Sequence, residues 1–284
     1  MTSTLAQKPA STELTGGAGF TYEATVVAYY LAHLLRRERA AGQSGIVTSV
    51  AVQRQGHGNP MDDLVVGLDD AGTQKSLSLQ IKKSVTISGA ESNEEFRGII
   101  AAAVATQALE SFVKVTDSCG FVVEHVTDST FRSLLRLIDW EKSNPDSNDF
   151  DTRFATAGTA GADEKRLRDG LLPVIGAVNV DEEVSFYRNF AALHLSGLEE
   201  GGVLRSEIIN RLQELVAVNV DRQDILLFDR LCQIAREGAA NAAKWTRSTL
   251  LAQLHGSVQL NVAPNFSADS RHRHWSAFPK TGPG

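Results

Sequence analysis

Residues 63–84, with the sequence DLVVGLDDAGTQKSLSLQIKKS, predict a β-hairpin. The apolar run at 63–68 and the alternating run at 76–84 are typical of strands, and residues 69–72 between them are typical of a turn. The segment 46–53 before them is rich in β-branched residues and alternates in polarity, which predicts another strand. Because short connections join all three strands, we expect an antiparallel meander.

Helical patterns flank this meander on both sides. Apolar residues recur at helical spacing over 21–41, and a capping box followed by a similar pattern predicts a second helix over 92–115. The segment 120–126 predicts a buried strand and 129–141 a third helix. Residues 16–143 therefore predict the order α-β-β-β-α-β-α, which is a three-layered α/β unit with a mixed sheet.

The second half of the chain differs from the first in composition and in hydrophobic periodicity. The composition at 143–161 shifts to Asp, Asn, Ser, Thr, Gly and Pro, which predicts a linker or a long surface loop. Residues 162–256 predict an all-α domain, for which oligomerisation or partner docking is the expected role by analogy. Residues 1–15 and 257–284 are expected to be tails or linkers. The helices predicted in this half are 183–195, 204–216, 222–237 and 239–255.

The totals set limits on the class of protein. The 28 basic and 34 acidic residues give a formal net charge of −6, so a basic nucleic-acid-coating surface is not expected, although a local basic groove would be compatible. Cys119 and Cys232 are far apart and fit no metal-ligand spacing, which favours a reducing setting without disulfides or zinc. With no apolar signal core and no membrane-length apolar run, we expect a cytoplasmic protein.

Polar residues interrupt the apolar strands at a few positions. Side chains alternate along a strand, so Gln80 and Lys82 lie on one face of the predicted strand 76–84, and Asp63 begins the strand before it. Oxygen ligands beside an ammonium group are what a divalent-metal phosphodiester hydrolase requires. The simpler alternative is a solvent-facing polar side on an edge strand. Asp62 is the alternative ligand if the register differs by one residue.

Glu23 adds a second carboxylate. It precedes Val26, Val27 and Tyr30 by three, four and seven residues, which places it on the apolar stripe of the first predicted helix. A carboxylate on such a stripe is costly unless it is paired, hydrogen-bonded or bound to a metal. The alternative explanation is a first-turn Glu favoured by the helix dipole. The dipole explains the turn but not the face, so we favour a role in the site.

The residues Gly19 to Glu23, Asp63 and Gln80-Ile81-Lys82 resemble the motifs of the PD-(D/E)XK nuclease superfamily. The resemblance covers residues 16–143. It is greatest to the Mrr-like group and to the double-stranded-DNA endonuclease effectors of bacterial anti-phage systems such as CBASS. It implies a restriction-endonuclease-like domain in which Asp63, Gln80 and Glu23 hold Mg²⁺ or Mn²⁺. Gln80 replaces the usual acid, and Lys82 would position or activate the attacking water.

The same resemblance implies a biological setting. The expected activity is metal-dependent endonuclease cleavage of double-stranded DNA by an anti-phage effector. This effector would form a homo-oligomer, and oligomerisation or an NTPase partner such as a HerA-type ATPase would activate it. One alternative is a DNA repair, junction-resolving or methyl-directed restriction nuclease. Another is a non-catalytic scaffold that binds nucleic acid or a partner.

Overall fold

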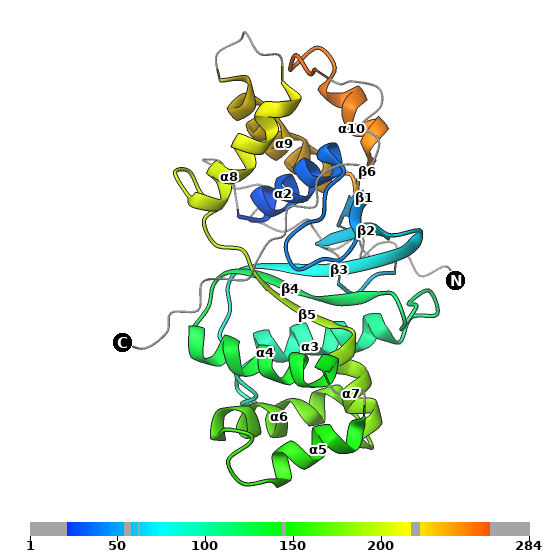
Figure 1. Ribbon diagram of the computed structural model, residues 1–284, viewed down its shortest axis with the longest axis vertical. Coiled ribbons are helices and arrows are strands. Elements are labelled where there is room, and N and C mark those ends of the chain that lie inside the picture. The colour runs from blue at the N-terminus through cyan, green and yellow to red at the C-terminus, as the bar shows by residue number, and fades with distance from the viewer. Residues whose placement is uncertain (1–21, 54–57, 62, 144–145, 217–221, 262–284) are drawn as a thin grey trace, which may run out of the picture.

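The computed structural model describes residues 22–53, 58–61, 63–143, 146–216 and 222–261. A six-stranded sheet runs through the middle of the molecule in the order β5-β4-β3-β2-β1-β6 (Figure 1). Strands β3–β4 and β4–β5 pair in parallel, whereas the other neighbours are antiparallel, so the sheet is mixed. The strands are β1 (Ile46–Val52), β2 (Leu64–Asp70), β3 (Thr73–Ser84), β4 (Ser118–His125), β5 (Phe190–His194) and β6 (Lys244–Thr246).

The predicted antiparallel meander β1–β2–β3 is confirmed. Strands β2 and β3 are longer than predicted, because Asp70 pairs directly with Thr73. Only Ala71 and Gly72 remain in the loop, with φ of +53° and +91°. Two consecutive residues with positive φ form the type of two-residue turn that matches the twist of a hairpin. Asp69 supports this turn, since its Oδ1 accepts a hydrogen bond from the Gly72 nitrogen at 2.7 Å.

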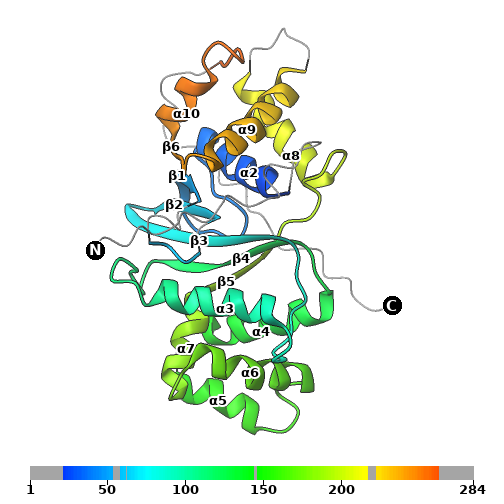
Figure 2. The same cartoon turned by 180° about the vertical axis from the view of Figure 1, so that it is seen from behind.

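Helices cover both faces of the sheet, and both views show the same two layers (Figures 1 and 2). The layer on one face consists of α2 (Tyr22–Arg36), α8 (Val203–Leu212), the short 3-10 helix η2 (Gln213–Leu215), α9 (Gln223–Ala239) and α10 (Arg247–Leu254). The layer on the other face consists of α3 (Glu94–Gln107), α4 (Asp128–Ser143), α5 (Ser147–Ala155), α6 (Ala162–Ile175) and α7 (Val180–Arg188).

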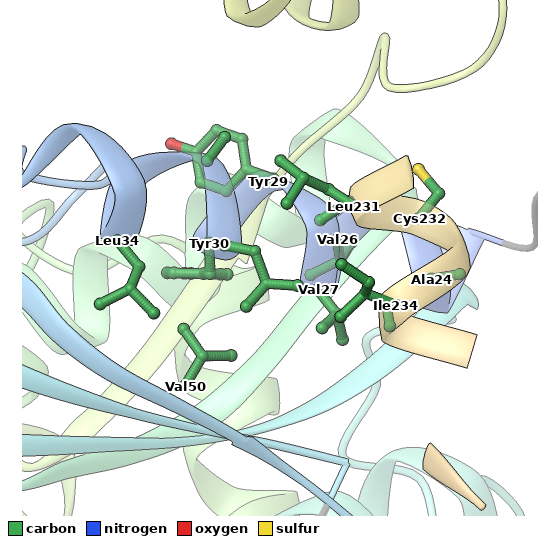
Figure 3. Close-up of a cluster of buried hydrophobic side chains, with 14 of the residues drawn as sticks. Ala24, Val26, Val27, Tyr29, Tyr30, Leu34, Val50, Leu231, Cys232 and Ile234 are labelled. Carbon is green, nitrogen blue, oxygen red and sulfur yellow. The ribbon is translucent and has the colours of Figure 1, made fainter. Parts of the chain in front are cut away.

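Helix α2 lies at the centre of the first layer. Its residues from Ala24 to Leu35 are all buried, as expected for a helix that is apolar on all sides. Figure 3 shows its side chains between Val50 of β1 and Leu231 and Ile234 of α9. The helix ends at Arg36 instead of near residue 41, because Arg37 adopts a left-handed φ of +55°.

A second core fills the space between the sheet and α3, α4, α6 and α7. Aromatic rings from three elements meet there, with Phe121 of β4 lying 5.9 Å from Phe96 of α3 and 6.1 Å from Phe190 of β5. Next to Phe121, Gly120 allows the β4 and β5 backbones to approach closely, since a Cβ atom there would lie 1.8 Å from the Ala191 oxygen. The two cores lie on opposite faces of the sheet.

In residues 22–143 the seven elements occur in the predicted order α-β-β-β-α-β-α. The prediction for residues 162–256 was wrong in two places, because this segment is not all helical. The helix expected over 183–195 is α7 followed by β5, and β6 lies within the helix expected over 239–255. Both strands pair with the same sheet as β1–β4, so the two predicted parts share one sheet.

The segment 143–161 is also different from the prediction, since it contains α5 instead of only a loop. Asp146 caps this helix by accepting a hydrogen bond from the Asn148 nitrogen at 2.9 Å.

The tail predicted at 1–15 lies outside the described residues, as do residues 262–284 of the tail predicted at 257–284. None of the helices in the described part of the chain has the length and apolarity that crossing a bilayer requires.

Candidate functional site

Three of the predicted site residues lie on one face of the sheet. Leu64 of β2 pairs with Leu79 of β3, and both side chains belong to the core beneath α2. Because side chains alternate along a strand, Asp63 before Leu64 and Gln80 after Leu79 point to the opposite face. Lys82 follows Gln80 by two residues and shares this face. All three are partly exposed and lie near the carboxyl end of β3.

The Asp63 carboxylate is attached directly to β3. Its Oδ2 accepts a hydrogen bond from the backbone nitrogen of Ile81 at 2.8 Å. Ile81 separates Gln80 from Lys82, so this bond holds the carboxylate beside both residues. A carboxylate fixed by a backbone donor is a well-ordered potential metal ligand.

Glu23 reaches the same end of the sheet from the opposite layer. Its Oε1 accepts a hydrogen bond from Nε2 of Gln53 at 3.0 Å. Gln53 directly follows Val52, which pairs with Leu64, so Gln53 and Asp63 leave their strands next to each other. The start of α2 is held there, because the Tyr22 hydroxyl donates to the Leu195 oxygen at 3.1 Å.

The other two predicted residues present unused polar groups. Neither the Gln80 amide nor the Lys82 ammonium makes a hydrogen bond or ion pair with any residue that the structure describes. Both side chains are partly buried. An amide oxygen and an ammonium group in this state can contact a bound ion, a water molecule or a phosphate without first breaking a protein contact.

The donor chemistry fits Mg²⁺ or Mn²⁺. Two carboxylates and an amide supply the hard oxygen ligands that these ions prefer, and Mg²⁺ commonly keeps several waters when few protein ligands are present. Within the described residues, no group of three or more His, Cys, Asp or Glu side chains could hold a metal ion. An ion at this site would therefore rely on Gln80 and water besides Glu23 and Asp63. Asp62, the alternative ligand, lies outside the described residues.

Two further polar residues at this end of the sheet were not identified from the sequence. Gln53 orients Glu23 and has a φ of +51°, an uncommon conformation for a residue other than Gly. Glu124 near the end of β4 is only 6% exposed, and its Oε2 lies 3.5 Å from Nε2 of His125 without accepting a hydrogen bond from the described residues. Burial, and then the charge of Glu124, raise the pKa of Tyr22. A Glu directly after the apolar residues 121–123 was the available signal.

Comparison with known proteins finds matches among solved structures. No protein-family model and no curated protein matches the chain. A solved structure of the Acinetobacter baumannii Cap4 SAVED/CARF-domain containing receptor with the cyclic trinucleotide 3'3'3'-cAAA is similar at 12% identity and a TM-score of 0.46, over 84% of this chain. The Moraxella osloensis Cap4 SAVED/CARF-domain containing receptor is similar at 13% identity and a TM-score of 0.42, also over 84% of this chain. The matches cover 46% and 47% of those two receptors, so the chain spans less than half of their length.

Proposed function

We propose that this protein is a metal-dependent endonuclease that hydrolyses phosphodiester bonds of double-stranded DNA. The observation that carries the proposal is the position of the Asp63 carboxylate. It accepts a hydrogen bond from the backbone nitrogen of Ile81, the residue between Gln80 and Lys82. Gln80 and Lys82 have no competing contact among the described residues. The arrangement combines oxygen ligands with a cation, as metal-assisted phosphodiester hydrolysis requires.

Each residue has a distinct role in the proposed reaction. A bound Mg²⁺ or Mn²⁺ would polarise the phosphoryl oxygen and lower the pKa of a coordinated water. Asp63 and the Gln80 amide oxygen would hold the ion, and Glu23, oriented by Gln53, would complete its shell directly or through water. The Lys82 ammonium would donate hydrogen bonds to the attacking water or to a phosphate oxygen, which stabilises the negative charge that develops there.

The element order supports a restriction-endonuclease-like arrangement. Helix α2, the meander β1–β3, helix α3, the parallel strand β4 and helix α4 follow one another as the motif resemblance predicts. The proposed setting is the one implied by the same resemblance, an anti-phage effector activated by oligomerisation or by an NTPase partner. A homo-oligomeric effector would show cleavage that rises more than linearly with protein concentration.

The direct test is cleavage of supercoiled plasmid with Mg²⁺, with and without EDTA. Lys82→Ala and Asp63→Asn should each reduce cleavage by about 100-fold or more. Lys83→Ala is the matched control, because Lys83 is the adjacent residue, is exposed and points to the other face of β3. It should cut like the wild-type protein. Wild-type rates for both Lys82→Ala and Asp63→Asn would show that this is not the site.

One observation favours the non-catalytic alternative. Among the described residues, no three His, Cys, Asp or Glu side chains form a group that could hold a metal ion. A scaffold would bind duplex DNA without cutting it at any Mg²⁺ or Mn²⁺ concentration. If the protein does cut, comparing plain, branched and methylated duplexes separates a general effector from a repair, junction-resolving or methyl-directed nuclease.

A further inference from the structure

A polar cavity lies at the opposite end of the sheet from the candidate site. Its volume is about 610 Å³, which is in the range of small-molecule sites. Strand β3 connects the two ends, with Lys75 lining the cavity and Lys82 lying about 23 Å further along the strand. The lining comes from the loop after α2, the starts of β3 and β4, the loop before β4 and the end of α7.

Arg188 lines this cavity and is anchored through one side of its guanidinium group. Its Nε donates to Oε1 of Glu141 at 2.6 Å, and the Glu141 side chain on α4 is 1% exposed. The Arg188 side chain is 49% exposed, and its two terminal nitrogens make no hydrogen bond with the described residues. A guanidinium anchored at Nε presents these nitrogens as a fixed pair of donors, which suits bidentate binding of a phosphate.

Asn189 connects Arg188 to the facing loop. Asn189 is 5% exposed, and its Nδ2 donates to the backbone oxygens of Lys114 and Asp117 at 2.7 and 2.8 Å. The loop that carries Lys114 is therefore fixed beside the residue that follows Arg188. The Lys114 side chain is exposed and makes no ion pair with the described residues, which leaves a second cation available at the cavity.

The one carboxylate among the lining residues is already occupied. Asp117 accepts hydrogen bonds from the Ser76 nitrogen at 2.9 Å, the Val113 nitrogen at 2.9 Å and the Thr116 hydroxyl at 3.2 Å. Lys75 also lines the cavity, where it contacts Ser44 and Asp70. The nearby charges largely balance, so a bound anion would be recognised mainly through the directed donors of Arg188 and Lys114.

We propose that this cavity binds the phosphoryl group of a ligand of nucleotide size, with Arg188 as the bidentate donor and Lys114 as the second cation. The volume exceeds that of a phosphate alone, and Leu68 and Val115 add apolar surface for the remainder of the ligand. This site is separate from the proposed nuclease site and does not depend on it. The phosphoryl group could belong to a free nucleotide or to a nucleic-acid backbone, and binding experiments can separate these sources.

The test is calorimetric titration of the full chain at low salt with adenosine 5′-monophosphate, adenosine and inorganic phosphate. The monophosphate should bind at least about tenfold more tightly than adenosine, because adenosine lacks the phosphoryl group that Arg188 and Lys114 would contact. Arg188→Lys keeps the charge but loses the paired donors, and it should weaken binding at least about tenfold. Arg166→Ala is the control, because Arg166 is a 79% exposed arginine that does not line this cavity.

Lys114→Ala keeps the test valid if variants of Arg188 do not fold, because Lys114 is exposed and its side chain makes no hydrogen bond or ion pair with the described residues. It should weaken monophosphate binding several-fold without changing the melting temperature. A DNA duplex that displaces the monophosphate would identify a nucleic-acid backbone as the source, whereas failure to displace it would identify a free nucleotide. The proposal is overturned if neither adenosine 5′-monophosphate nor inorganic phosphate binds, or if monophosphate binding is unchanged in both Arg188→Lys and Lys114→Ala.

Discussion

Asp63 and Ile81 are joined by a hydrogen bond of 2.8 Å between a carboxylate oxygen and a backbone nitrogen. Asp63 directly precedes the first residue of β2. Its side-chain hydrogen bond therefore adds one contact to the backbone ladder between β2 and β3. The backbone register continues from Leu64, which pairs with Leu79. One carboxylate therefore has a structural role in the hairpin and a proposed chemical role beside Gln80 and Lys82.

These two roles of Asp63 can be separated by two substitutions. Asp63→Ala removes the acceptor and should lower the free energy of unfolding by about 1–2 kcal/mol. Asp63→Asn retains an acceptor oxygen and should cost less than about 1 kcal/mol, while still removing the charge that a metal ion requires. Urea denaturation monitored by circular dichroism measures the first effect, and plasmid cleavage measures the second. Equal destabilisation by the two variants would argue against the structural role.

Gly120 is expected to be essential for the contact between β4 and β5. Its Cβ atom in an Ala variant would meet the Ala191 backbone only 1.8 Å away, so the strands would have to separate. We expect Gly120→Ala to lower the free energy of unfolding by about 3 kcal/mol. Gly98→Ala is the matched control, because Gly98 lies within α3 and a Cβ atom there meets nothing within 4 Å. It should increase stability by about 0.5–1 kcal/mol in the same urea titrations.

Arg168 joins three helices of the second layer. Its Nε and Nη2 donate to the Glu183 carboxylate at 2.8 and 2.7 Å, its Nη2 also reaches Asp151 at 2.9 Å, and the guanidinium lies 4.3 Å from the Phe154 ring. The Glu183 side chain is only 2% exposed. Arg168→Ala should therefore cost about 3–5 kcal/mol, because it leaves a buried charge without a partner.

A double variant tests whether the cost of Arg168→Ala comes from the unpaired charge of Glu183 or from lost packing. Replacing both partners, as Arg168→Met with Glu183→Leu, should restore most of the lost stability, since the buried charge of Glu183 is then removed with its partner. Arg166→Ala on the same helix should cost less than about 0.5 kcal/mol, because Arg166 is 79% exposed and its contact with Asp163 is 3.4 Å long. A double variant as unstable as Arg168→Ala would mean that the charge is not the cause.

The parts of the fold that were predicted correctly have strong local signals. Alternating β-branched residues and a turn ending in Gly72 predicted the meander, because these properties depend on neighbours in the sequence. The strand β5 was missed for the opposite reason. Residues 190–194 contain two Ala and one Leu, which favour helix, and the segment becomes a strand by pairing with β4. Pairing with a strand distant in sequence leaves no local pattern.

The candidate site also has one part that local sequence patterns predicted and one part that they did not. The shared face of Gln80 and Lys82 follows from their spacing along one strand. The contact between Glu23 and Gln53 depends on how α2 packs over β1, so the sequence contained no local pattern for it. Helix α5 was missed because its Ser, Asn and Asp residues are typical of loops, although Asp146 caps the helix. Spacing along the sequence predicted which side chains share one face of a strand. Tertiary packing determines which side chains of other elements they meet.

The last prediction concerns His33, a buried residue of α2. His33 is 6% exposed, and its Nδ1 lies 2.9 Å from the Tyr29 oxygen. Burial lowers the pKa of His33, and the Tyr29 hydrogen bond and the charge of Glu38 only partly oppose this effect. A lowered pKa in the folded state means that the unfolded chain binds the proton more tightly. The free energy of unfolding should therefore fall as the pH drops through the ordinary histidine value of about 6.5.

This loss of stability should continue until the pH is below the folded-state pKa of His33, and it should then level off for this residue. His33→Leu removes the titrating group while keeping an apolar side chain between α2 and its neighbours. Urea titrations at several pH values between about 7.5 and 5.5 should show a smaller decrease for this variant than for the wild-type protein. An equal decrease would assign the acid sensitivity to other groups. Such a result would also mean that protonation of His33 costs no free energy, although the side chain is buried and the neighbouring Arg36 and Arg211 oppose a positive charge there.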